Sequence, residues 1–276
     1  MQVALVTAAL AFYGLGILLT LPSVIQRRPS LSPASLGALG FGLLAHGALL
    51  TLQTVEAHRL PLVDVHGALS VFSFFTTLAF FFVYLRYRIT SLGIFMLPLA
   101  FVLTLISSIR TETLPATPAF RSGWLLVHIT SILFGYVGFL LTFVAATMYL
   151  IQERELKSKR PRAFYYRLPS LEVCDELYIR SLIFGLPFLT LGIVTGFVGA
   201  TREWKGGWEL DPKILASLVT WFIYLVLFST RMSGSWRGRR SAYLAIFGFS
   251  LMMVTFLGIS FLSGQHGFFP NLGGKP

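Results

Sequence analysis

The chain has 276 residues, of which 55% are hydrophobic and only 12% charged, and its mean hydropathy is +0.75. Soluble domains carry about 25% charged residues, so this composition excludes an ordinary soluble protein and indicates an integral membrane protein. Basic residues beside an anionic lipid bilayer account for the formal net charge of +11, and we expect no nucleic-acid partner.

Eight apolar segments follow one another along the chain, each close to the roughly 20 residues that a bilayer-spanning helix needs. They cover residues 3–21, 34–53, 66–85, 91–109, 123–151, 178–199, 212–230 and 241–263. Such runs are too long for the alternating strands of a membrane barrel. The sequence therefore predicts an all-α polytopic bundle of about eight transmembrane helices. The first segment lacks the basic start and the cleavage site of a signal peptide.

Basic residues are distributed unevenly between the two ends of these segments. Most Lys and Arg residues fall in the connections 21–33, 86–90, 152–177 and 231–240. The positive-inside rule makes these connections cytoplasmic, so both termini and the 200–212 loop are predicted to be extracytoplasmic. The predicted location is the bacterial cytoplasmic (inner) membrane.

The chain reads as an N-terminal four-helix membrane portion, 1–110, followed by a second portion, 111–276, and the two are predicted to form one structural domain. The 152–177 connection is predicted to be the largest soluble piece, with residues 165–178 forming a short interfacial helix. It contains the single cysteine, Cys174. One cysteine excludes an intramolecular disulfide and a CxxC or CxxCH motif.

Four of the five histidines fall on or near the predicted extracytoplasmic face: His58, His66, His128 and His266. Trp204 and Trp208 lie in a loop that opens on the same face. Imidazole is a good iron ligand, and two imidazoles from separate helices can hold a flat macrocycle between them. Tryptophans offer rigid apolar surface for stacking. An ordinary interfacial belt of aromatic residues and hydrated histidines is the alternative.

Two of the histidines, His46 and His66, are candidates for a secondary or intramembrane ligand. His46 falls in the middle of an apolar segment, where an ionisable residue indicates a functional site. The alternative is a neutral imidazole hydrogen-bonded to a neighbouring helix. His66 follows Asp64 by two residues, a spacing that permits a carboxylate–imidazole pair orienting a ligand, or a purely interfacial role.

The stretch WKGGWELDPKILASLVTWFIYLVLFSTR, residues 204–231, resembles the tryptophan-rich WWD signature of the haem-handling cytochrome c assembly family, most closely its CcsA branch. The matching residues are Trp204, Trp208, Asp211, Pro212, Lys213, Thr220, Trp221, Tyr224 and Arg231. The resemblance covers about residues 120–276 and makes 111–276 a CcsA-like core. It implies that His128 and His266 ligate the iron of non-covalent haem b, with Trp204, Trp208 and Asp211 as a haem platform. Asp211 before a proline is also a typical helix cap.

Three departures from the family pattern are informative. Leu210 replaces a tryptophan and Ile214 a glutamate. Ser229 stands where the family has a histidine linked to haem passage through the membrane, and a hydroxyl cannot replace imidazole on iron. A transmembrane haem relay is therefore not expected at this point unless His46 compensates.

The resemblance implies a protein that binds haem for delivery to apocytochrome c, together with a ResB/CcsB-like membrane subunit. The sequence predicts no catalytic residues, so the chain is not expected to be an enzyme alone, although it fits a subunit of a haem lyase complex. A HemX-like regulator acting on glutamyl-tRNA reductase is the alternative, which the departures favour. A small-molecule transporter is less supported, because no inverted repeat or Gly/Pro-interrupted pair is visible.

Overall fold

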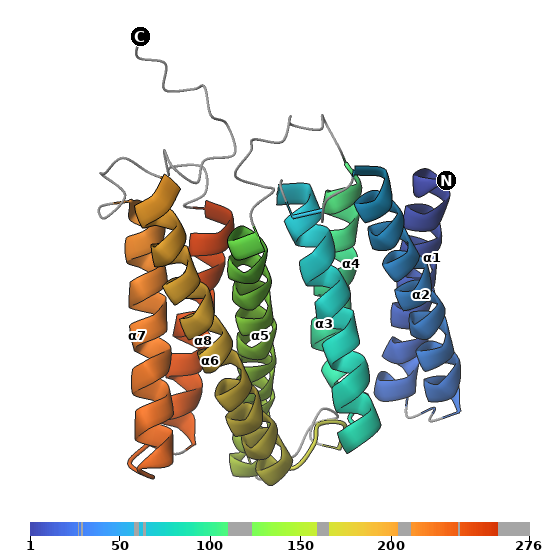
Figure 1. Cartoon of the computed structure of the whole chain (residues 1–276). Helices are drawn as coiled ribbons and strands as arrows, with labels where there is room; N and C mark the ends of the chain where they lie inside the picture. Colours follow the sequence, from blue (N-terminus) through green and yellow to red (C-terminus); the bar gives the residue numbers. More distant parts are fainter. Residues whose placement is uncertain are drawn as a thin grey trace. The chain divides into compact units, whose positions relative to one another are not determined.

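The computed structural model describes residues 1–26, 28, 30–57, 61–62, 65–109, 123–158, 166–203, 211–236 and 238–258. These residues form helices joined by turns, without a β-strand among them (Figure 1). The helices are α1 Gln2–Ile25, α2 Leu31–Ala57, α3 Val65–Tyr87, α4 Leu92–Ser108, α5 Gly123–Lys157, α6 Leu171–Glu203, α7 Pro212–Met232, α8 Arg239–Met253 and the π-helical turn η3 Val254–Gly258. The predicted all-α class is confirmed.

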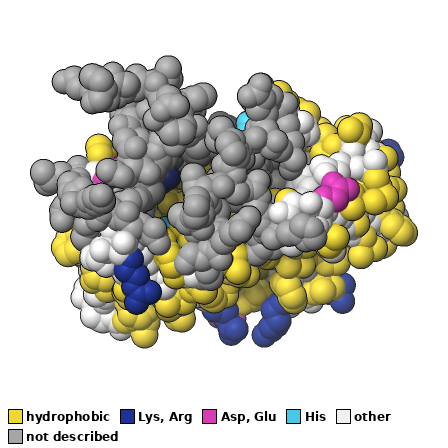
Figure 2. Space-filling model, turned by 45° about the horizontal axis from the view of Figure 1, so that its top comes forward, with side chains coloured by type: hydrophobic (Ala, Val, Ile, Leu, Met, Phe, Trp, Pro, Cys, Tyr) yellow, Lys and Arg dark blue, Asp and Glu magenta, His cyan; other side chains and the backbone are white. Residues whose placement is uncertain are grey.

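Six of the described helices are long and apolar enough to cross a membrane, namely α1, α2, α3, α5, α6 and α7. Helix α4 has 17 residues and α8 has 15, and η3 continues α8. Hydrophobic side chains make up most of the coloured surface in Figure 2, as expected of helices that face lipid. These features indicate a multi-pass membrane protein, whereas eight crossings and extracytoplasmic termini stay predictions.

The chain divides into two compact units. The first consists of Met1–Thr117 and Arg154–Pro169, and the second of Pro118–Glu153 and Ser170–Pro276. Helices α1 to α4 therefore belong to the first unit. Helices α6 to α8 and all but the last turn of α5 belong to the second.

The first unit is held together by small residues and hydroxyl groups between its helices. A β-carbon at Gly16 would lie 2.6 Å from Leu39 Cγ, so glycine allows α1 and α2 to approach closely. Between α3 and α4, Ser73 Oγ donates to the Ala100 carbonyl at 2.7 Å and lies 2.7 Å from Thr104 Oγ1. These hydroxyls are buried and find partners within the unit.

Helix α5 packs against the other three helices of the second unit. Phe139 stacks on Tyr224 of α7 with ring centroids 3.6 Å apart, and Phe143 stacks on Phe249 of α8 at 4.5 Å. Against α6 the approach is closest at Gly138, where a β-carbon would lie 2.7 Å from Gly185 Cα. Aromatic stacking and glycine contacts together position the helices that surround the site described below.

The predicted 152–177 connection is wrong in its extent. Helix α5 continues to Lys157 and α6 begins at Leu171, so the predicted interfacial helix 165–178 is largely the first turns of α6. Cys174 is a buried residue of α6 and not of a loop. Hydropathy detects the apolar part of a helix, whereas the charged turns at these two ends continue the same backbone hydrogen bonding outside the apolar region.

Candidate functional site

His128 lies in the second turn of α5, half-buried, and its ring reaches toward α6. Its Nδ1 atom lies 2.7 Å from the backbone carbonyl oxygen of Gly192. A carbonyl can only accept a hydrogen bond, so Nδ1 carries the proton and donates it. In the neutral ring the other nitrogen, Nε2, then presents a lone pair, which is the form in which histidine binds a metal ion.

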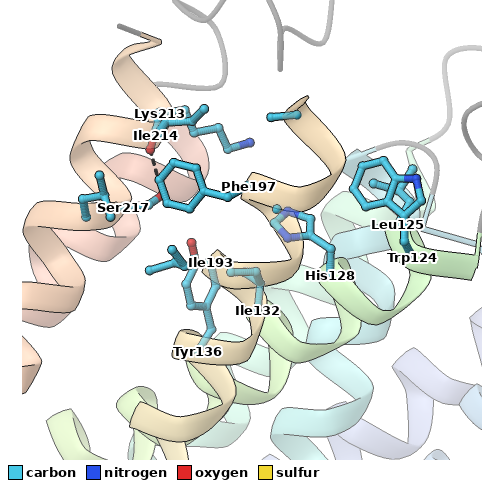
Figure 3. Close-up of a pocket in the computed structure, with 13 residues that line it drawn as sticks. Trp124, Leu125, His128, Ile132, Tyr136, Ile193, Phe197, Lys213, Ile214 and Ser217 are labelled. Carbon is cyan, nitrogen blue, oxygen red and sulfur yellow. Dashed lines mark hydrogen bonds between the residues drawn. The ribbon is translucent and has the colours of Figure 1, made fainter. Parts of the chain in front are cut away.

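A cavity of about 130 Å³ lies between α5, α6 and α7 in the second unit (Figure 3). Most of its wall is apolar, from Leu125, Ile132, Ile193, Phe197, Ile214 and Leu218. Its ionisable side chains are His128, Lys213 and Tyr136. The cavity therefore combines an apolar wall with an imidazole, an ammonium and a phenol.

These three polar groups come from different places around the cavity. Figure 3 shows His128 on α5 and Lys213 on α7, with the ring of Phe197 from α6 below the Lys213 side chain. Tyr136, two turns further along α5 from His128, is almost completely buried. An anionic group bound here would therefore meet the Lys213 ammonium, whose nitrogen end extends toward the His128 side of the cavity in Figure 3.

Asp211 begins α7 beside this cavity. Its Oδ1 atom accepts hydrogen bonds from the backbone N–H groups of Lys213, at 2.8 Å, and Ile214, at 3.4 Å. Pro212 occupies the first helical position, where its missing N–H costs nothing. The side chain of Asp211 is therefore a helix cap, which is one of the two roles considered for it, and it fixes the turn from which Lys213 enters the cavity.

The sequence matches the profile described as "Cytochrome C assembly protein" over residues 37–266, which is most of the chain. The chain belongs to the cytochrome c assembly protein family. Its relatives include three proteins named cytochrome c biogenesis protein CcsA. That of Guillardia theta is 28% identical over 80% of both chains, that of Mesostigma viride 25% over 96% of this chain and 93% of its own, and that of Gloeobacter violaceus 28% over 90% of both.

The residues of α7 that carry the sequence resemblance form contacts between the helices of the second unit. Trp221 Nε1 donates to Thr190 Oγ1 of α6 at 2.9 Å, and Tyr224 is completely buried against α5. The buried Arg231 guanidinium donates from Nη2 to Asp175 of α6 at 2.7 Å. Ser229, the serine that departs from the resemblance described above, donates to the carbonyl of Leu225 in its own helix.

His46 is completely buried in the first unit, and hydroxyl groups contact both of its ring nitrogens. Nδ1 lies 3.1 Å from the Tyr13 hydroxyl and Nε2 lies 2.9 Å from Ser70 Oγ. The ring therefore bridges α1, α2 and α3 in this structure. This arrangement is the hydrogen-bonded alternative that the sequence left open.

His66 lies at the start of α3 in the first unit. Its Nδ1 atom lies 3.1 Å from the carbonyl oxygen of Ile106 in α4, so Nδ1 donates a hydrogen bond to that carbonyl. Its predicted partner, Asp64, lies outside the described residues, as do Trp204, Trp208, His58 and His266. Of the proposed haem-contacting residues, the structure thus describes His128 and Asp211.

Reasoning from the sequence missed Trp124 and the glycines Gly192, Gly196 and Gly199, all of which contribute to the surroundings of His128. The signal that could have found them is spacing. The three glycines follow one another at intervals of four and three residues, so they lie on one face of α6. Trp124 precedes His128 by four residues and lies on the same face of α5.

Proposed function

We propose that this chain is a haem-handling protein of cytochrome c biogenesis, which binds haem b non-covalently beside the cavity of the second unit. Membership of the cytochrome c assembly family and relatives named CcsA support the biological context. The observation that supports the site is the hydrogen bond from His128 to the Gly192 carbonyl, because it leaves Nε2 as a lone-pair donor in an apolar surrounding.

The chemistry of the cavity fits one edge of a haem. Imidazole is a usual axial ligand of haem iron, and the wall is mostly apolar. The volume of about 130 Å³ is below the roughly 300–1,000 Å³ of sites that enclose a whole small molecule, so this cavity would hold only one edge of a macrocycle. When bound, haem supplies the vinyl groups that are joined to the CxxCH thiols of apocytochrome c.

The residues of the chain have distinct parts in this proposal. His128 and His266 would hold the haem iron, while Trp204 and Trp208 would provide a flat surface for stacking. Lys213 offers a positive charge to a haem propionate. Asp211 acts through its helix cap, because the cap orients the first turn of α7 and with it Lys213.

The proposed setting is the bacterial cytoplasmic membrane, with the tryptophan-rich loop and His128 at the extracytoplasmic face. A ResB/CcsB-like membrane subunit and apocytochrome c are the proposed partners. The chain binds and orients haem, and the thioether chemistry belongs to haem and the cysteine thiols. We assign His46 to helix packing, because hydroxyl groups contact both of its ring nitrogens. We assign His66 a secondary role at the start of α3, where its Nδ1 atom contacts the Ile106 carbonyl.

A regulatory function is the second candidate, in which the chain resembles HemX-type proteins and acts on glutamyl-tRNA reductase. The observation that favours it is Ser229, whose hydroxyl bonds to its own helix where the family histidine is linked to haem passage. A third candidate, small-molecule transport, has no structural observation in its favour.

Cells that lack this chain and are complemented with variants separate the two leading functions. Wild type should restore haem-stained c-type cytochromes, and His128→Ala should not. His66→Ala serves as a matched control and should restore most of the signal. The cellular level of glutamyl-tRNA reductase should be the same in all of these strains. Normal c-type cytochromes in cells without the chain, together with an altered reductase level, would overturn the assembly function in favour of regulation.

A further inference from the structure

The side chains of α5 that surround the site lie on a glycine face of α6. Gly199, Gly196 and Gly192 lie opposite Trp124, His128 and Ile132 respectively. Each glycine of the antiparallel helix α6 thus faces one residue of α5. Successive members of each set of three are about one helical turn apart. His128 occupies the middle of this series.

The absence of a side chain at Gly196 makes room for the imidazole. A β-carbon there would lie 2.7 Å from His128 Cε1 and 2.9 Å from Nδ1, which is closer than carbon and nitrogen atoms pack. The neighbouring ring of Trp124 fills the space that a side chain at Gly199 would need, and its centroid lies 6.4 Å from that of His128. The ring of His128 is therefore enclosed on the α6 side and on the Trp124 side.

The same helix supplies the acceptor that orients the ring. The Gly192 carbonyl accepts from His128 Nδ1 at 2.7 Å and also from Thr195 Oγ1 at 3.0 Å. A carbonyl bonded in this way has a fixed direction, so the bond sets both the plane of the imidazole and the position of its proton. The hydrogen bond is possible because Gly196 lets the ring reach the backbone of α6.

We propose that Gly192 and Gly196 of α6 are positioning residues, which hold His128 as the Nδ1–H tautomer with Nε2 directed away from α6. Gly196 supplies space and Gly192 supplies the acceptor. One part of this inference, Nε2 as the iron ligand, rests on the proposed function. The tautomer of His128 does not, because it is a property of the chain without haem. Free histidine prefers the Nε2–H tautomer, so the contacts with α6 are needed to hold His128 in the Nδ1–H form.

The chain offers a matched control for the packing effect. In Gly192→Ala the β-carbon would lie 2.6 Å from Ile132 Cδ1 and 2.8 Å from Ile132 Cγ1. In Gly196→Ala it would lie 2.7 Å from His128 Cε1. Both substitutions add one methyl group to the same interface at similar distances. Only the alanine at Gly196 touches the imidazole, and Gly192→Ala retains the backbone carbonyl.

The test is the ring-nitrogen chemical shifts of ¹⁵N-histidine-labelled, haem-free, full-length protein, with the His128 signals assigned from a His128→Gln variant. Wild type and Gly192→Ala should show a protonated Nδ1 and an unprotonated Nε2 at His128. Gly196→Ala should shift His128 toward the Nε2–H form. The proposal is overturned by an Nε2–H tautomer in wild type, by an unchanged tautomer in Gly196→Ala, or by equal changes in both alanine variants.

A failure of Gly196→Ala to fold leaves the wild-type shifts and Gly192→Ala to decide the proposal. Haem titration then distinguishes this proposal from the proposed function. With haem bound, Gly196→Ala should weaken the low-spin bands relative to wild type. A wild-type chain with the Nδ1–H tautomer that takes up no haem would overturn the haem function and leave the positioning role in place.

Discussion

Three histidines of this chain differ in their surroundings, and the surroundings decide what each ring can do. Hydroxyls contact both nitrogens of His46, so its ring ties three helices together. His66 and His128 each donate from Nδ1 to a backbone carbonyl, so a metal ion would meet the other ring nitrogen, Nε2. Of these two, His128 lies in the wall of an apolar cavity of the second unit.

Replacing Asp211 by alanine removes the cap of α7. Two backbone N–H groups lose their acceptor, and we expect a loss of about 1 kcal/mol in the free energy of unfolding. Asp211→Asn can accept the same hydrogen bonds and should retain most of the stability and the haem content. Unfolding in detergent by SDS titration measures both variants. A haem loss in Asp211→Asn at unchanged stability would instead indicate direct haem contact.

At the scale of helices, hydropathy predicted where the described helices occur, and the Asp211-Pro212 pair indicated where α7 begins. The ends of α5 and α6 were not predicted, because charged residues such as Glu153 and Lys157 can continue a helix beyond the apolar region. The cavity could not be predicted either. The spacing of Gly192, Gly196 and Gly199 defines a face of α6, but it does not identify α5 as the partner of that face.

The contact between α5 and α6 leaves the least room for an added side chain beside the facing backbone at Gly138. A β-carbon would lie 2.7 Å from Gly185 Cα and 2.9 Å from Gly185 N, and backbone atoms cannot move aside without separating the helices. Gly138→Ala should therefore lower the free energy of unfolding by about 1–3 kcal/mol.

Gly37→Ala is the control for that substitution, because nothing lies within 4 Å of its β-carbon. Alanine favours a helix over glycine by about 0.5–1 kcal/mol, so Gly37→Ala should be neutral or slightly stabilising. The same SDS titration compares the two. Equal stabilities of Gly138→Ala and Gly37→Ala would contradict the close approach of α5 and α6.

At the scale of the molecule, the second unit has two chemically different ends. The cavity end contains Trp124, Ala200 and Lys213. The arginine end contains the pairs Arg231–Asp175, at 2.7 Å, and Arg239–Glu153, at 3.5 Å. The positive-inside rule predicts that the arginine end is cytoplasmic and the cavity end extracytoplasmic. This orientation would bring His128 to the face where apocytochrome c receives haem in the proposed function.

Cysteine labelling tests this orientation directly. Cys174 is almost completely buried, so the natural chain should give little background. Thr201→Cys at the cavity end and Ser235→Cys at the arginine end both introduce exposed thiols. A membrane-impermeant maleimide added to intact cells should label Thr201→Cys, and Ser235→Cys should react only after the membrane is opened. The reverse pattern would contradict the proposed sides.

The most direct measurement of the central claim is the visible absorption spectrum of the reduced, detergent-purified protein, with its haem quantified as the pyridine haemochrome. Wild type should show the sharp α and β bands of low-spin, bis-imidazole haem b. His128→Ala should lose these bands or become high spin, while His46→Leu should keep them, because His46 is assigned to packing. A wild-type chain that remains haem-free after reconstitution, or a His128→Ala spectrum identical to wild type, would contradict the account.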